Sequence, residues 1–207
     1  MKFVLLVEGK TERESVNFLK RWLDSQLQQP VGVQPVKFEG YSEFRKNVMA
    51  KARSHLNSPK NDEIIAVIGL LDLYGPNFYP PELQTVSERY DWAKQDIERE
   101  VGDPRFRMFF AVHEYEAWLL SHPAIFPREI QESLRDQSVS PEKVNFDEPP
   151  AKLLERLYPL KLRRQYKKAV DGPKLFAKLD TSIAVDRCPY LKRMLQEMRS
   201  LAKDRGL

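Results

Sequence analysis

The sequence predicts an α/β protein, in which helices flank a mostly parallel sheet and a helical appendage follows at the C-terminal end. Three short, continuous apolar runs carry this prediction, at residues 3–7, 64–71 and 108–112. Apolar runs of strand length without a polar face are typical of strands buried on both sides, and such strands occur in parallel sheets. Segments with helical periodicity separate the runs, so we expect right-handed crossovers between the strands.

The remaining elements follow from periodicity and turn residues. Residues 11–14 match the capping box that opens a helix, and Ser42 is expected to cap the next helix. A less regular strand at 33–38 contains Pro35, which favours a sheet edge or a bulge. Further helices are expected to end at Gly102, to lie around 130–134, and to form at 153–157, 162–170, 175–179 and 190–202.

Composition limits the class of protein. The chain has 207 residues, of which 42% are hydrophobic and 31% charged, and this balance excludes disordered and fibrous classes. No stretch approaches the length of a membrane span, and the N-terminal apolar run is too short for a secretory signal, so we expect a cytoplasmic protein without membrane contact. The single cysteine, Cys188, excludes an internal disulfide and is expected to be a buried apolar side chain.

Charge divides the chain after the proline pair at 149–150. Residues 1–150 carry 19 basic and 24 acidic side chains, whereas residues 151–207 carry 15 basic and 6 acidic ones. We therefore expect an α/β domain at 1–122, a proline-rich connection with a short helix at 123–150, and a basic helical region at 151–207. Such separation of charge favours contact with nucleic acid, although a solvated helical face is the commoner origin of a basic run.

Each of the three apolar runs ends at an acidic side chain. Glu8 follows the first run, Asp72 follows the second, and Glu114 and Glu116 follow the third. The carboxyl ends of parallel strands meet at one edge of a sheet, where ligands bind in open α/β folds, so we expect these carboxylates to converge. Taken singly, each acid has a common structural alternative, which is to cap the next helix or to pair with a surface cation.

Converging carboxylates need a compensating positive charge. Two of them about 4 Å apart repel by roughly 4 kcal/mol at an effective dielectric constant of about 20. A proton, a lysine or arginine, or a divalent cation compensates for this, and Mg²⁺ or Mn²⁺ suits a site made only of oxygen ligands. A transition-metal site is disfavoured because the three histidines, His55, His113 and His122, form no ligand motif.

These motifs resemble a known fold. An apolar strand followed by Val-Glu-Gly at 7–9, and Asp72 after another strand, resemble the Toprim fold of topoisomerases, primases and OLD-family nucleases. The chain is more closely similar to a small Toprim-like family encoded beside ATPases in bacterial defence loci. The motifs of that likeness are VEGKTE at 7–12, LDLYG at 71–75 and HEYEAWLL at 113–120, with the less specific YKKAVDGP at 166–173 and RCPY at 187–190.

The resemblance implies a metal-dependent nuclease that cleaves DNA or RNA and works with an ATPase partner in antiphage defence. Glu8, Asp72, Glu114 and Glu116 would bind Mg²⁺ or Mn²⁺, and Glu12 would complete the site or activate water. The family likeness also makes Lys168 the expected transition-state cation, with a solvated surface lysine as the alternative. The basic side chains expected to hold nucleic acid are Lys161, Arg163, Arg164, Lys167, Lys168 and Lys174.

One residue departs from the Toprim pattern. Toprim proteins generally present Asp-x-Asp-Gly after the second motif strand, whereas Tyr74 holds the second acidic position here. A neutral phenol does not replace a carboxylate as a Mg²⁺ ligand, so Glu114 or Glu116 supplies the ligand or the site is catalytically weak. The alternative to a nuclease is therefore a degenerate Toprim-like module that binds nucleic acid or the ATPase. Polymerisation or strand passage ranks last, and the choice of DNA, RNA or tRNA stays open, as does a homodimer.

Overall fold

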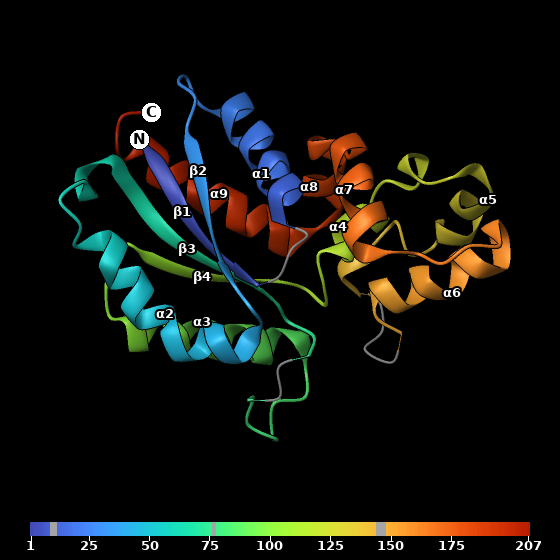
Figure 1. The fold of residues 1–207 in the computed structure, drawn as a ribbon, viewed down its shortest axis with the longest axis horizontal. Helices are drawn as coiled ribbons and strands as arrows, with labels where there is room; N and C mark the ends of the chain where they lie inside the picture. The colour runs from blue at the N-terminus through green and yellow to red at the C-terminus, as the bar shows by residue number, and fades with distance from the viewer. Residues whose placement is uncertain (9–11, 76–77, 144–147) are drawn as a thin grey trace.

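The protein has a parallel β-sheet at its centre. The computed structural model describes residues 1–8, 12–75, 78–143 and 148–207, and the side chains of residues 12–14 lie outside the described part. Within these residues the sheet has four parallel strands in the order β2-β1-β3-β4 (Figure 1). They are β1 (Lys2–Glu8), β2 (Gly32–Phe38), β3 (Ile64–Asp72) and β4 (Phe106–Ala111). The α/β prediction is confirmed, because each apolar run forms a strand.

Strand β2 lies at an edge of this sheet. It pairs with β1 along its whole length, from Lys2 opposite Gly32 to Glu8 opposite Phe38. Pro35 lies within β2 and has no N–H group to donate to a second neighbouring strand. The edge position expected from Pro35 is therefore confirmed.

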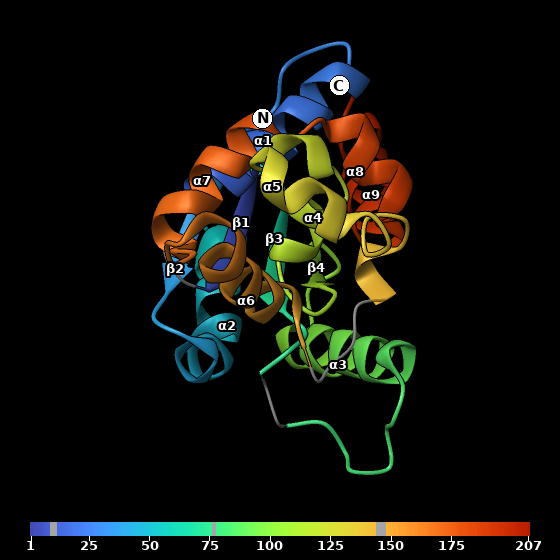
Figure 2. The ribbon, with the colours of Figure 1, turned by 90° about the vertical axis from the view of Figure 1, so that its right-hand side faces the viewer.

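Helices cover both faces of the sheet, as the view turned by 90° shows (Figure 2). Phe3 and Val7 of β1 belong to a hydrophobic cluster with residues of α1 and α9, whereas Val4 and Leu6 belong to a second cluster with residues of α2 and α3. The alternation follows from the two-residue period of a strand. These helices are α1 (Glu12–Gln26), α2 (Tyr41–Leu56), α3 (Val86–Val101) and α9 (Pro189–Lys203).

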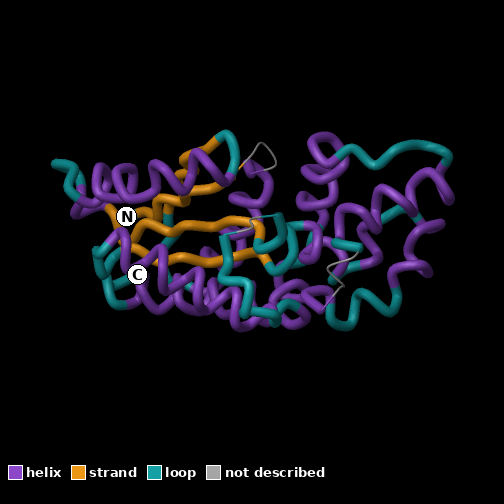
Figure 3. The backbone as a smooth tube through the Cα atoms, turned by 90° about the horizontal axis from the view of Figure 1, so that it is seen from below, coloured by secondary structure: helices purple, strands orange, loops and turns teal. Residues whose placement is uncertain are grey.

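The other helices gather at one end of the molecule, beyond the carboxyl ends of the strands (Figures 1 and 3). They are α4 (Glu116–Leu120), α5 (Arg128–Gln131), α6 (Pro150–Leu162), α7 (Lys168–Lys178) and α8 (Thr181–Arg187). Single 3₁₀ turns occur at η1 (Asn61–Glu63), η2 (Pro123–Ile125), η3 (Glu132–Leu134) and η4 (Pro141–Lys143). Of the helices described, none has the length and apolar character needed to cross a bilayer.

The hydrophobic core extends across the segment boundaries expected from the sequence. The cluster that contains Phe3 of β1 also contains Trp118 of α4, Phe176 of α7 and Leu195 of α9. Cys188 lies in the same cluster with a free thiol, and its burial was predicted correctly. Burial raises the pKa of this thiol, so it remains protonated and acts as a packing group.

The helix predicted at 162–170 is wrong. Helix α6 ends at Leu162, Arg163 adopts a left-handed conformation with φ 53°, and α7 begins at Lys168. The carboxylate of Asp171 explains the break, because it accepts a hydrogen bond from the backbone N–H of Lys167 at 2.8 Å. This bond fixes the start of α7 at a point where the apolar periodicity of the sequence is continuous.

Helix starts were only partly predictable. Ser42 lies inside the first turn of α2, whose N-cap is Gly40 with φ 116°, so the predicted serine cap is wrong. The capping box expected at 11–14 lies outside the described residues. Helix α3 has a capping box that was not anticipated, in which Thr85 and Glu88 exchange hydrogen bonds. Helix α3 ends at Gly102, as predicted, and Gly102 adopts the left-handed conformation there.

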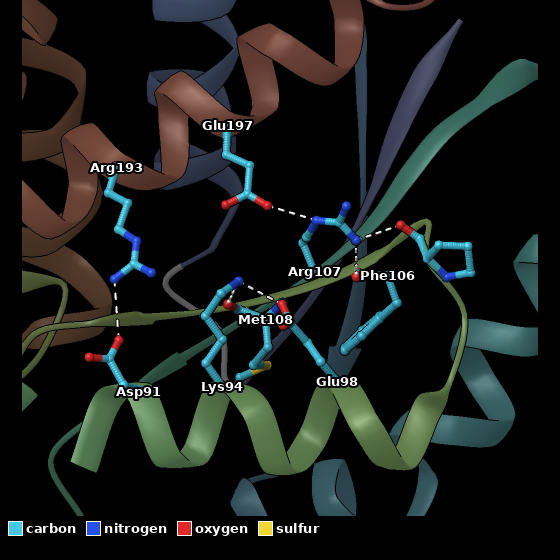
Figure 4. A network of polar contacts seen from close by, with 9 residues as sticks. Asp91, Lys94, Glu98, Phe106, Arg107, Met108, Arg193 and Glu197 are labelled. Carbon is cyan, nitrogen blue, oxygen red and sulfur yellow. Dashed lines mark hydrogen bonds and ion pairs between the residues drawn. The ribbon is translucent and has the colours of Figure 1, made fainter. Parts of the chain in front are cut away.

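Helix α9 is held to the sheet and to α3 by ion pairs (Figure 4). Arg107 of β4 pairs with Glu197 at 2.7 Å, and Arg193 pairs with Asp91 of α3 at 3.3 Å. These contacts place the last helix of the basic region beside the sheet. We refer below to this set as the α3–β4–α9 network, which consists of Asp91, Lys94, Glu98, Arg107, Arg193 and Glu197.

Candidate functional site at the carboxyl edge of the sheet

The site lies where the direction of the strand order reverses. The chain passes outward from β1 to β2 on one side and from β3 to β4 on the other, so β1 and β3 are neighbours at the switch point. Glu8 is the last residue of β1 and Asp72 is the last residue of β3. A crevice outside the carboxyl ends of two such strands is the place where open α/β sheets bind ligands.

Asp72 is the central carboxylate of the site. Its Oδ1 accepts a hydrogen bond from the backbone N–H of Tyr115 at 3.2 Å, and its Oδ2 lies 3.7 Å from Nζ of Lys168. Burial raises the pKa of Asp72 to about 8. The ammonium of Lys168 opposes this rise, and the negative charges of nearby carboxylates add to it. Those carboxylates belong to Glu116, Glu114 and Glu8.

A left-handed turn after β4 separates the two later acids. His113 is buried with φ 56°, a conformation that costs about 1–2 kcal/mol for a residue with a Cβ atom. The backbone carbonyl of His113 accepts a hydrogen bond from the N–H of Tyr74, which extends the pairing of β3 and β4 into the turn. Burial lowers the pKa of His113, which favours the neutral imidazole. Because the chain turns here, Glu114 lies in the loop while Glu116 starts α4.

Glu114 and Glu116 have different partners. The Oε2 of Glu116 lies 3.0 Å from Nζ of Lys168, and the side chain of Glu116 is only 1% exposed. The Oε2 of Glu114 accepts a hydrogen bond from the N–H of Ala151 at 2.9 Å, in the first turn of α6. Burial raises the pKa of Glu114, and the charge of Glu116 adds to the rise. A buried carboxylate is tolerated only with such partners.

Lys168 links the acids of two strand ends. Burial lowers the pKa of its ammonium, but the charges of Asp72, Glu116 and Glu114 outweigh burial, and the net pKa is raised. The pKa values of Asp72 and Lys168 therefore both lie above their ordinary values. Each group therefore keeps its proton to a higher pH than usual. At Asp72 the causes are burial and three nearby carboxylates, which together outweigh the opposing ammonium. We call Glu8, Asp72, Glu114, Glu116 and Lys168 the carboxyl-edge cluster.

The donor set of this cluster fits a hard divalent cation, because it is made of carboxylate oxygens with excess negative charge. Within the described residues, however, no group of three His, Cys, Asp or Glu side chains is spaced to hold a metal ion. The cation that these acids share in the structure is the ammonium of Lys168, whose Nζ lies within 3.7 Å of oxygens of both Asp72 and Glu116.

The remaining predicted residues lie in varied settings. The side chain of Glu12 lies outside the described part. Arg164 forms an ion pair with Asp171, in which each terminal guanidinium nitrogen lies 3.0 Å from a carboxylate oxygen. The sequence did not predict this pair. The other residues expected to hold nucleic acid are exposed on α6, on α7 or between them, namely Lys161, Arg163, Lys167 and Lys174.

Sequence reasoning missed four residues of the site. Tyr115 and Ala151 contribute backbone N–H groups, which leave no mark in a sequence. The proline pair before Ala151 was the available signal, because proline favours the first turn of a helix. Lys152 has its Nζ 6.0 Å from the ring centroid of Tyr74. Tyr166 has a buried hydroxyl without a hydrogen-bond partner among the described residues. Burial is the main cause of its raised pKa, and the charge of Glu116 adds to the rise.

A family model described as Domain of unknown function (DUF4276) matches residues 7–199. The chain belongs to this family. The match includes the whole carboxyl-edge cluster, from Glu8 to Lys168, together with β2, β3, β4 and the last two residues of β1. No curated protein and no solved structure matches the chain. Membership of the family therefore assigns no activity, and the chemistry of the site has to be inferred from its residues.

Proposed function

We propose that this protein is a nuclease that depends on Mg²⁺ or Mn²⁺ and hydrolyses phosphodiester bonds of DNA or RNA. The observation that supports it is the excess of carboxylates at the switch point, where Glu116, Glu114 and Glu8 act on Asp72 against one ammonium. The resemblance of the surrounding motifs to Toprim proteins agrees with this chemistry. The same resemblance leads us to propose a cytoplasmic role in antiphage defence, with an ATPase partner.

Asp72 and Glu116 would hold the divalent cation, with Glu8 and Glu114 as the further carboxylates. When bound, such a cation polarises a phosphodiester and favours the ionised form of water. Tyr74 holds the place of the second Toprim aspartate, and its ring faces the ammonium of Lys152 rather than supplying a carboxylate. The acidic turn after β4 would therefore replace the missing ligand.

The chain's own cations would bind and stabilise the substrate. The side chain of Lys168 is 38% exposed, although its ammonium contacts the buried carboxylate of Glu116. An ammonium at this end of the sheet favours a phosphate whose negative charge increases in the transition state. Exposed basic residues between α6 and α7 would hold the phosphate backbone, because an acidic cluster alone repels nucleic acid.

The test compares Asp72→Asn with Asp91→Asn, a matched change in the α3–β4–α9 network. Purified proteins are incubated with supercoiled plasmid, single-stranded DNA and tRNA, in Mg²⁺, in Mn²⁺ and in EDTA. We expect Asp72→Asn to lower the cleavage rate by about 10²–10³-fold, as removal of a single electrostatic group in other active sites does, and Asp91→Asn to leave it unchanged. Cleavage by Asp72→Asn at the wild-type rate, or in EDTA, contradicts the proposal.

A second function is favoured by two observations. Lys168 already compensates part of the charge of Asp72 and Glu116 without a metal, and Tyr74 stands in place of one Toprim acid. The cluster therefore also suits a module that only binds nucleic acid or the ATPase. A binding module predicts no cleavage of any substrate in either metal. It also predicts that Asp72→Asn retains nucleic-acid affinity, measured by gel shift, or retains the ATPase in a pull-down.

A further inference from the structure

The ammonium of Lys168 faces the oxygens that a cation at the switch point would need. Its Nζ lies 3.0 Å from Oε2 of Glu116 and 3.7 Å from Oδ2 of Asp72. The other oxygen of Asp72 already accepts the hydrogen bond from the N–H of Tyr115. A divalent cation binds through the same lone pairs that now face the ammonium. The two cations therefore compete for one set of oxygens.

The backbone of Lys168 is held in place, whereas its side chain is partly exposed. Asp171 accepts a hydrogen bond from the N–H of Lys167 at 2.8 Å and is itself held by both guanidinium nitrogens of Arg164, which fixes the first turn of α7. The side chain of Lys168 is 38% exposed, while that of Glu116 is 1% exposed. A flexible four-carbon stem lets the ammonium move toward solvent without a shift of the helix.

We propose that Lys168 is an internal counter-ion that a divalent cation displaces from Asp72 and Glu116. In the metal-free protein the ammonium compensates part of the negative charge of these side chains. When the cation binds, like-charge repulsion drives the ammonium outward to the rim of the site, where it meets a phosphate of the substrate. The contact with phosphate rests on the proposed function, whereas the competition between ammonium and metal does not.

If Lys168 competes with the metal, its removal should raise the affinity for the metal. If Lys168 instead holds the metal ligands in place, its removal should lower that affinity. Two cations that oppose each other lower each other's affinity by the same factor, so removal of the ammonium strengthens metal binding. A lysine that merely orients Asp72 and Glu116 as ligands would have the reverse effect, since its removal would loosen them.

The experiment measures Mn²⁺ binding to the full chain by electron paramagnetic resonance of free Mn²⁺. We expect Lys168→Met to lower the Kd for Mn²⁺ at least about tenfold, because it removes a like charge beside the ion. Lys168→Arg keeps the charge and should stay close to wild type. Lys178→Met, an exposed lysine in the last turn of the same helix, should leave the Kd unchanged. An equal or weaker affinity in Lys168→Met overturns the proposal.

Thermal melts in EDTA and in Mn²⁺ distinguish a change in metal affinity from a loss of folding. Circular dichroism should show that Lys168→Met melts at a lower temperature than wild type in EDTA and recovers in Mn²⁺, because the ion replaces the lost positive charge. A variant that stays unfolded in saturating Mn²⁺ contradicts the proposal, as does the absence of Mn²⁺ binding in both wild type and Lys168→Met. A wild type that binds Mn²⁺ but cleaves no nucleic acid refutes the proposed nuclease alone, because the comparison of Kd values still tests the displacement.

Discussion

Two charged clusters of this protein differ in balance. The α3–β4–α9 network pairs three basic side chains with three acidic ones (Figure 4). Its members also satisfy backbone groups, since Lys94 donates to the carbonyl of Met108 and Glu98 accepts from the N–H of Met108. Each charge therefore has a partner, and the network joins two helices to a strand.

The carboxyl-edge cluster lacks this balance. Lys168 is shared between Asp72 and Glu116, and the charges of Glu114 and Glu8 add to the negative potential on Asp72. Burial and these carboxylates raise the pKa of Asp72. The excess negative charge favours a further cation, whereas the network has no excess charge to attract one. Unbalanced charge at a strand end, rather than the number of charged residues, therefore marks the candidate functional site.

The largest difference between the two clusters is expected in nuclease activity, when Glu116→Gln of the carboxyl-edge cluster is compared with Glu197→Gln of the network. Loss of Glu116 should lower nuclease activity by about 10²–10³-fold, because it removes an oxygen donor of the cluster. Its melting temperature in EDTA should not fall, since relief of repulsion with Asp72 and Glu114 offsets the lost attraction to Lys168. Cleavage assays and thermal melts measure both quantities.

Glu197→Gln should show the opposite pattern. It weakens the ion pair with Arg107, so stability should fall by up to about 1 kcal/mol while activity is retained. Loss of activity in Glu197→Gln would contradict the assignment of a structural role to the network. A Glu116→Gln variant that is destabilised but still cleaves would contradict the assignment of a functional role to the carboxyl-edge cluster.

The strands and their acidic ends could be predicted because both signals are local. Continuous apolar runs identified β1, β3 and β4, and Pro35 identified the edge position of β2. Asp72 and Glu8 were found because the last residue of a parallel strand lies at a known edge. These features depend on a few consecutive residues, so the sequence alone contains the information.

Contacts between distant segments could not be predicted in the same way. The left-handed turn at His113 sends Glu114 toward α6 and Glu116 toward Lys168, and histidine carries only a weak signal for that conformation. The hydrogen bond from the N–H of Lys167 to Asp171 ends the helix at a point where the spacing of apolar residues predicts that it continues. Such outcomes depend on which side chain reaches which backbone group, and a pattern of hydrophobicity does not encode this.

A raised pKa alone does not mark the functional site. Glu142 tests this point, because its expected effect on the pH dependence of stability is the next largest. Burial raises the pKa of Glu142 to about 7, although its carboxylate accepts hydrogen bonds from the N–H groups of Tyr190 and Leu191. Below about pH 4.5 the group is protonated in both states and carries no penalty. As pH rises toward 7 the unfolded chain ionises first, so Glu142 lowers stability by about 2 to 3 kcal/mol.

Glu142→Gln should therefore reduce the loss of unfolding free energy between pH 5 and pH 8, as measured by urea denaturation. Cleavage should be retained, because Glu142 caps α9 and does not belong to the carboxyl-edge cluster. A variant with the same pH slope as wild type would show that the folded protein already holds Glu142 ionised. Loss of activity would place this acid in the functional site and weaken the comparison.

The smallest effect is expected in the network itself, at the pair of Asp91 and Arg193. Both side chains are about half exposed, at 47% and 50%, and their atoms approach to 3.3 Å. Water and salt screen such a pair, so a double-mutant cycle with Asp91→Asn and Arg193→Gln should give a coupling free energy of about 0.5 kcal/mol that declines in 0.5 M NaCl. Urea denaturation of the four proteins measures it. A coupling that is several times larger and insensitive to salt would mean that the network is as strongly coupled as a buried charge cluster. Balance of charge would then no longer distinguish a structural network from the carboxyl edge.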